Sequence, residues 1–143
     1  MATGGVFLLK HVTVLHLENM SHPQIVRIRI NPSERFFMFY IHSIYHEPVI
    51  EEFQIEGDAI VLKGVRTKSP AVMEYYGFED MREFHPVNRR LGAVYFKWGT
   101  GEGQGLIVRN KKFYLSEVGA RGDRIQLRVE SISLGCYLLS RVS

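Results

Sequence analysis

The sequence predicts an all-β fold, either a small β-sandwich or a β-barrel of about ten short antiparallel strands. Stretches in which apolar and polar residues alternate recur along almost the whole chain, and they are rich in β-branched and aromatic residues. Turn signals built from Gly, Asn, Asp and Pro separate these stretches at intervals of roughly 8 to 12 residues. A chain of 143 residues, with 45% hydrophobic and 23% charged residues, has the size and composition of one globular domain.

The expected strands follow one another with little intervening chain. We expect strands at Val6–Glu18, Ile25–Ile30, Arg35–Tyr45, Val49–Glu56, Ile60–Arg66, Ala93–Trp98, Gly105–Arg109, Lys112–Ser116, Ile125–Ile132 and Tyr137–Arg141. The turn signals between them include Asn31-Pro32-Ser33, Gly57-Asp58, Asn110-Lys111 and Arg121-Gly122-Asp123. The one long interruption, Met73–Arg90, is polar and contains His85-Pro86, and a short helix is expected near residues 78–85.

The ends of the chain, its charge and its cysteine content narrow the classes of function. Residues 1–5 are expected to be a flexible start or a vector remnant, with residues 6–143 forming a single β domain. No apolar run reaches the roughly 20 residues of a membrane-spanning helix. The formal net charge of +3 is too small to demand nucleic acid as a partner. Cys136 is the only cysteine, which excludes an internal disulfide and a cysteine-based zinc site and fits either a reducing or an extracytoplasmic compartment.

No motif calls for a cofactor or a metal. The glycine-rich stretch Gly99–Gly105 lacks the Gly-Lys-Ser/Thr of a phosphate-binding loop and leads into an expected strand rather than a helix. We therefore interpret it as a loop between strands. The six histidines show no metal-binding spacing, so the sequence predicts neither a cofactor nor a metal ion.

The hairpin around Gly57-Asp58 places a charged residue on an apolar face. A two-residue turn predicts the pairs Ile55–Ile60, Phe53–Leu62 and Glu52–Lys63. The same register puts Glu51 on the apolar face, opposite Gly64 and diagonal to Arg66.

The preceding hairpin brings a histidine to the same place. A loop centred on His46-Glu47 predicts the pairs Ile44–Val49, Tyr40–Phe53, Met38–Ile55 and His42–Glu51. We therefore expect His42, Glu51 and Arg66 to form a polar cluster within apolar surroundings, where charges must pair to be tolerated.

Three interpretations of this cluster stay open. It can be a buried ion network that fixes the register, or the floor of a pocket for a ligand or an anion, with Tyr40 and Tyr76 as neighbours. In the third, His42 and Glu51 act as a general acid/base pair. The third lacks a nucleophile, because Ser43 points to the opposite face of its strand.

A second feature is a basic strand. Arg27 and Arg29 alternate with the apolar residues of Ile25–Ile30, which predicts a half-buried strand with a basic outer face. Other cations that would extend this patch are Arg89, Arg90, Lys97, Lys111 and Lys112. Nucleic-acid binding would also need exposed aromatic residues, and here most aromatic residues belong to strand patterns of the core.

Several short motifs occur together between Arg35 and Arg66. They are His42-Ser43-Ile44, Pro48-Val49 and Glu51-Glu52-Phe53, followed by the hairpin at Gly57-Asp58. In these motifs the chain resembles the bacterial family known as domain of unknown function 1850, and His42, Ser43, Pro48, Val49 and Glu51 match its motif positions. The stretches Tyr114–Glu117 and Gly122–Ile125 are similar to its closing strands, whereas Ser69–Val72 departs from its Gly-Ala-Gly-type step.

The resemblance implies an extracytoplasmic, periplasmic accessory protein encoded beside tripartite solute transporters of the TRAP/TAXI type, although the family's export segment is not visible in this chain. The family has no established activity, so none is implied. We therefore expect a non-enzymatic accessory or small-ligand-binding module, with a membrane transporter or a solute-binding protein and a small carboxylate as partners. The alternatives are a structural protein–protein interaction domain that docks through an open sheet edge or an apolar patch, and a hydrolase-like enzyme using His42 and Glu51.

Overall fold

The described residues form ten strands in two antiparallel sheets, which confirms the all-β fold class. A computed structural model describes residues 7–97 and 103–142, so the predictions for residues 1–5 and for most of the glycine-rich loop lie outside the described residues.

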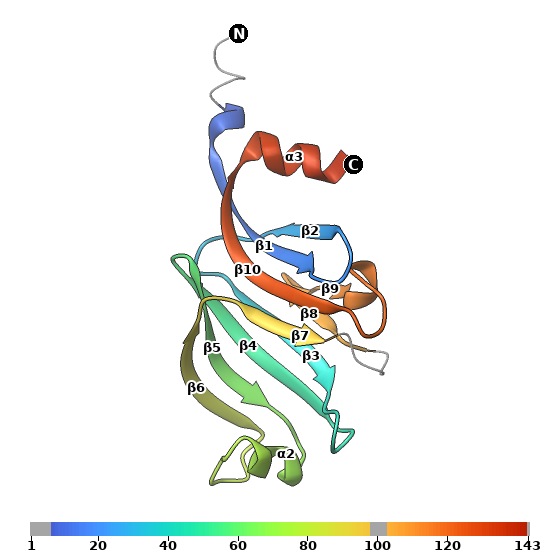
Figure 1. The fold of residues 1–143 in the computed structure, drawn as a ribbon. Coiled ribbons are helices and arrows are strands. Elements are labelled where there is room, and N and C mark those ends of the chain that lie inside the picture. Colours follow the sequence, from blue (N-terminus) through green and yellow to red (C-terminus); the bar gives the residue numbers. More distant parts are fainter. Residues whose placement is uncertain (1–6, 98–102, 143) are drawn as a thin grey trace.

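The four-stranded sheet has the order β2 (Gln24–Arg29), β1 (His11–Asn19), β10 (Arg124–Ser133), β7 (Val94–Lys97). The six-stranded sheet has the order β6 (Phe84–Leu91), β5 (Ala59–Arg66), β4 (Pro48–Glu56), β3 (Arg35–Ile41), β8 (Gly105–Val108), β9 (Lys111–Tyr114). The arrangement is a sandwich (Figure 1).

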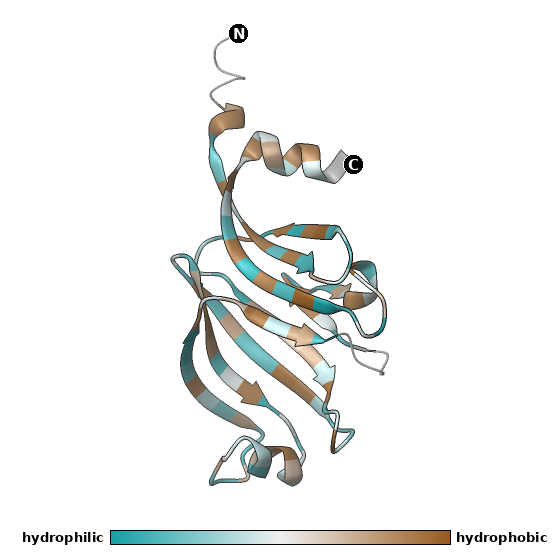
Figure 2. Cartoon of the chain, viewed as in Figure 1, coloured by the Kyte–Doolittle hydropathy of each residue, from teal (hydrophilic) through white to brown (hydrophobic). Residues whose placement is uncertain are grey.

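The main core lies between the two sheets. Alternate residues of each strand point inward, and Figure 2 shows apolar and polar residues alternating along the strands of both sheets. Leu15 and Leu17 of β1 and Leu127 of β10 contribute from one sheet, and Phe36 and Phe53 stack in the other at 5.3 Å between ring centroids. Burial of these side chains is the main source of stability of the domain.

The six-stranded sheet extends past the four-stranded one. Strands β3 to β6 continue beyond the sandwich to the end that carries α2 (Pro70–Tyr75) (Figure 1). A second, smaller cluster lies there, with Val49, Val65 and Val72 buried against one another. This extension leaves part of an apolar sheet face beyond the edge strand β7.

The helices differ from the sequence prediction. No helix forms at residues 78–85; the helix is Pro70–Tyr75, where the Ser69 side chain accepts the Val72 N–H at 3.3 Å and proline occupies the first turn. The strand predicted at Tyr137–Arg141 is also wrong, because this stretch belongs to helix α3 (Leu134–Val142). Leu134 and Tyr137 lie three residues apart and pack on Val12 of β1, which is a helical spacing rather than a strand spacing. Among the described residues, no helix is long and apolar enough to span a membrane.

A β-bulge at Lys63 sets the faces of the central strands. Phe53 pairs with Leu62 as predicted, but Glu52 pairs with Gly64 instead of Lys63. One extra residue in β5 moves every later side chain of that strand to the opposite face relative to the predicted register. Gly64 leaves room for the Phe84 ring, because a Cβ atom at this position would lie 2.3 Å from that ring and the ring would have to move.

Candidate functional site

The predicted cluster of His42, Glu51 and Arg66 does not form. In the β3–β4 pairing Glu51 lies opposite Met38, four residues from His42, which corresponds to about 13 Å along the strand. Arg66 pairs with Ile50 rather than lying diagonal to Glu51, is exposed, and has its guanidinium 5.2 Å from the centroid of the Phe84 ring. The bulge at Lys63 is the physical reason for the second error, because it turns Arg66 to the opposite sheet face.

The β3–β4 loop explains the first error. The loop spans six residues and is closed by the His42 N–H, which donates to the Glu47 carbonyl at 2.8 Å. His46 N–H donates to the His42 carbonyl at 2.8 Å, and His46 has a φ of 54°, so the chain turns earlier than the predicted centre at His46-Glu47. The predicted pairs Tyr40–Phe53 and Met38–Ile55 are therefore each displaced by four residues along β4.

The side chain of His42 organises this loop. Its Nδ1 accepts the N–H groups of Ile44 and Tyr45 at 3.3 and 3.4 Å, so the ring stabilises the turn that follows it. The ring is buried, stacks on Tyr45 at 5.2 Å and meets the edge of Tyr75 at 4.7 Å. Its neighbour Ser43 is exposed. His42 is therefore a structural residue of the loop, and the His42–Glu51 contact that the hydrolase interpretation required is not made.

Glu51 does lie on the apolar face, with two tyrosines. Tyr76 donates its hydroxyl to Glu51 Oε1 at 2.9 Å, and Tyr40 donates to the same oxygen at 3.2 Å. The two tyrosine hydroxyl oxygens also contact each other. Tyr40 and Tyr76, which were predicted to neighbour the cluster of His42, Glu51 and Arg66, therefore contact its Glu51 member.

Glu51, Tyr40 and Tyr76 form a hydrogen-bonded triad, and each of the three is positioned by a different element. Glu51 and Tyr40 belong to the paired strands β4 and β3, while Tyr76 forms the C-terminal cap of α2. The Tyr76 ring stacks on Phe78 at 5.5 Å, and Phe78 stacks in turn on His85 at 4.0 Å. The helix and this aromatic stack hold the Tyr76 hydroxyl above the Glu51 carboxyl group.

The triad opens onto a pocket of about 350 Å³ between the two sheets. Its apolar wall consists of Met38, Phe53, Leu62, Leu91, Val94 and Phe96. Besides the triad, polar side chains come from Arg89 of β6, Tyr95 of β7 and Gln104. The pocket lies where the six-stranded sheet extends past β7, so the overhang of one sheet creates it.

Burial governs the protonation of the triad. Desolvation raises the pKa of Glu51, and the two tyrosine hydrogen bonds, which favour the carboxylate, offset only part of that effect. Burial and the neighbouring carboxylate also raise the pKa of Tyr40 and of Tyr76, so both phenols stay protonated. The arrangement is a carboxyl group that gains a proton readily, beside two neutral donors.

Several functional residues were not predicted. The sequence predicts Arg89 as part of a basic patch, and it predicts the residues of the apolar wall only as part of the core. Arg89 lies on β6, a strand that was not predicted, four residues after His85. Recognising that strand would have been the way to place Arg89 relative to the pocket. Of the five family-motif positions, Val49 is buried, and the carbonyl of Pro48, three residues before Glu51 on β4, accepts a hydrogen bond from the Thr67 hydroxyl at 3.2 Å. Comparisons with known proteins gave no matching family model, no matching curated protein and no matching solved structure.

The raised pKa of Glu51 predicts a pH-dependent effect of the substitution Glu51→Gln. The unfolded state ionises near the ordinary value of 4.5, while the folded state holds its proton to higher pH. The wild type therefore loses stability relative to Glu51→Gln as pH rises above 4.5, with a slope of at most about 1.4 kcal/mol per pH unit, and the difference levels off above the folded-state pKa. Urea unfolding between pH 4 and 9 measures it. The exposed Glu56→Gln, on the same strand, is the control for the loss of a carboxyl group. A curve for Glu51→Gln that matches this control would contradict the raised pKa of Glu51.

The His42 loop predicts a loss of stability without a loss of the pocket. His42→Ala removes the ring acceptor and both aromatic contacts and should cost about 1–3 kcal/mol in thermal or chemical unfolding. His42→Asn, whose side-chain oxygen can accept the same N–H groups, should recover part of that loss. Ser43→Ala should change stability by less than about 0.5 kcal/mol. A larger effect of Ser43→Ala than of His42→Ala would contradict the structural role of His42.

Proposed function

We propose that the chain is a non-enzymatic module that binds a small carboxylate with an apolar body in the Glu51 pocket. The observation that carries this proposal is a protonatable carboxyl group, hydrogen-bonded to two tyrosine hydroxyls, at the polar end of an open and mostly apolar pocket. Concave, mostly apolar pockets with a few convergent polar groups are the usual form of small-molecule sites.

The size of the pocket limits the ligand. At roughly 30 Å³ for each water-sized group, a volume of about 350 Å³ holds about ten non-hydrogen atoms. A closed ion network that only fixed the register would leave no such space. This favours ligand binding over a purely structural role for Glu51.

The charges that line the pocket favour an anionic head group. Among the described residues that line the pocket, Arg89 is the cation, and the neutral form of Glu51 has a proton to donate. The single protons of the Tyr40 and Tyr76 hydroxyls are already donated to Glu51. A carboxylate ligand therefore accepts from Arg89 and from neutral Glu51, and the apolar body of the ligand contacts the wall. An ammonium ligand in the same place would be repelled by the positive charge of Arg89.

The cellular setting that we propose rests on the family resemblance of the His42–Ser43 and Pro48–Glu51 motifs. It is that of an extracytoplasmic accessory of a TRAP/TAXI-type transport system, with the transporter or its solute-binding protein as partner. The motif positions supply the loop at His42 and the strand that carries Glu51, and a carboxylate-binding module suits a system that takes up solutes.

Binding of aromatic and aliphatic carboxylates tests this function. Isothermal titration calorimetry with phenylacetate, 3-phenylpropionate and hexanoate should give a Kd of roughly 0.1–1 mM. Affinity should fall as pH rises through the pKa of Glu51, because the ionised side chain repels the ligand carboxylate. Glu51→Gln, which stays neutral, should remove this pH dependence.

Matched ligands and variants distinguish a carboxylate site from an amine site and from a pocket that binds no ligand. Arg89→Gln should weaken carboxylate binding by about fivefold or more, while Arg90→Gln, on the opposite face of β6 near Asp58, should not. If phenethylamine binds more tightly than phenylacetate, the ligand class is wrong. If no acid, amine or alcohol of this size binds to the folded protein at millimolar concentration, the pocket proposal fails.

A further inference from the structure

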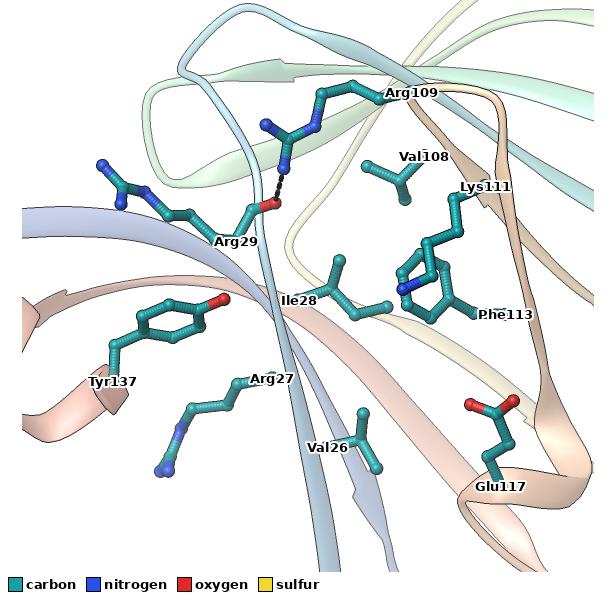
Figure 3. Close-up of a pocket in the computed structure, with 10 residues that line it drawn as sticks. All are labelled: Val26, Arg27, Ile28, Arg29, Val108, Arg109, Lys111, Phe113, Glu117 and Tyr137. Carbon is teal, nitrogen blue, oxygen red and sulfur yellow. Dashed lines mark hydrogen bonds between the residues drawn. The ribbon is translucent and has the colours of Figure 1, made fainter. Parts of the chain in front are cut away.

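A second groove lies at the opposite edge of the four-stranded sheet. It follows β2, has a volume of about 400 Å³ and lies between β2 and the β8–β9 hairpin (Figure 3). The lining residues that matter here are Arg27, Arg29, Arg109, Lys111, Val26 and Ile28. This groove is separate from the Glu51 pocket and goes beyond the function proposed above.

In the described part of the chain, no strand pairs with β2 on this side. β2 is an edge strand, and Ile30 N–H donates to the Thr13 carbonyl of β1 at 3.0 Å. Because pairing directions alternate along an antiparallel strand, the N–H and C=O groups of Ile25, Arg27 and Arg29 point away from β1. The Arg29 carbonyl confirms this direction, since it accepts from Arg109 Nη2 at 2.7 Å across the groove.

Cations flank the edge on both sides. Arg27 and Arg29 extend from one side of β2, whereas Arg109 and Lys111 lie on the other (Figure 3). Among the described residues that line the groove, Glu117 is the one acid, and a carboxylate oxygen of Glu34 lies 3.7 Å from the Arg109 Nε. The groove therefore carries an excess of positive charge.

Arg27 makes no ion pair with a described residue. The acids beside it on the outer face of the sheet pair with Arg128, at 2.7 Å for Glu130 and 3.6 Å for Glu18. Within the described part of the chain, the Nε atom of Arg27 is buried and has no hydrogen-bond partner. A buried donor without a partner is costly, so an incoming acceptor would be stabilised there.

The inner side of the edge is apolar. Val26 and Ile28 of β2 and Phe113 of β9 line the groove, and the Lys111 ammonium lies 5.2 Å from the Phe113 ring centroid. A strand added at β2 would continue the sheet, so its side chains would alternate between the arginines on the outer face and this apolar surface on the inner face.

We propose that an extended acidic peptide segment of a partner protein adds to β2 as a fifth strand of this sheet, with acidic residues facing Arg27 and Arg29 and apolar residues facing Val26 and Ile28. Main-chain hydrogen bonds to β2 supply affinity, and the alternation of acidic and apolar residues supplies specificity. A second copy of this chain is a poor occupant, because pairing two β2 edges would bring their arginines together.

The test uses a labelled, end-capped heptapeptide of alternating glutamate and valine, with fluorescence anisotropy on the full chain. We expect saturable binding that weakens with salt, and hydrogen exchange of the outward amides of Arg27 and Arg29 should slow on binding. Two further peptides are N-methylated at all valines or at all glutamates. One of the two should lose about tenfold or more in affinity, because it cannot donate to β2.

Variants of the groove complete the test. Arg27→Gln should weaken binding by about tenfold, and Lys111→Gln by about threefold. Lys112→Gln is the matched control, because Lys112 points to the opposite face of β9, near Phe39, and should have no effect. Lys111 is exposed, so its variant keeps the test valid if Arg27→Gln fails to fold. Equal binding of all three peptides, equal effects of the two lysine variants, full competition by inorganic phosphate at matched ionic strength, or no binding would each overturn the proposal.

Discussion

The desolvation of Glu51 is the constraint on which the rest of the site depends. A carboxylate in an apolar wall is unfavourable unless it is hydrogen-bonded or protonated. The hydrogen bonds are present, since Tyr40 and Tyr76 donate to one carboxylate oxygen, and burial raises the pKa of the group, which favours its protonated form. If the tyrosines were absent, the carboxyl group would have to reach water, and the pocket would lose its polar end.

The extension of the six-stranded sheet makes this arrangement feasible. The overhanging parts of β3 to β6 need a cover for their apolar face, and the small cluster around Val49, Val65 and Val72 provides it. The same cover includes the end of α2, which places Tyr76 over Glu51. His42 contributes from a distance, because it fixes the loop whose geometry sets the β3–β4 register. One structural requirement, covering an overhang, thus produces the site.

Much of the fold could be predicted from the sequence, because period-two patterns and turn residues are local signals. The strand at Pro48–Glu56 and the pairs Ile55–Ile60 and Phe53–Leu62 are examples. The prediction failed where a register depends on one residue that no local pattern marks. The bulge at Lys63 moved Arg66 away from Glu51, and the turn at His42 moved His42 away from it. The helix at Pro70–Tyr75 had a readable signal in Ser69-Pro70, whereas the strand after it was concealed by polar residues and a proline. The apolar face position of Glu51 was nevertheless correct, because both errors left its own strand face unchanged.

The two edges of the four-stranded sheet have different chemistry. The β7 edge borders a mostly apolar pocket with a protonatable end, and the β2 edge borders a basic groove in which no described strand pairs with the backbone of β2. The proposed function depends on the protonation state of Glu51, whereas the β2 proposal does not. A ¹³C NMR titration of the side-chain carboxyl of Glu51, assigned by its absence in Glu51→Gln, measures that state directly. We predict a midpoint above the ordinary value of 4.5, with the proton retained where exposed glutamates are already ionised. A midpoint at or below 4.5 would show that Glu51 is an ordinary solvated carboxylate and would contradict the desolvated triad.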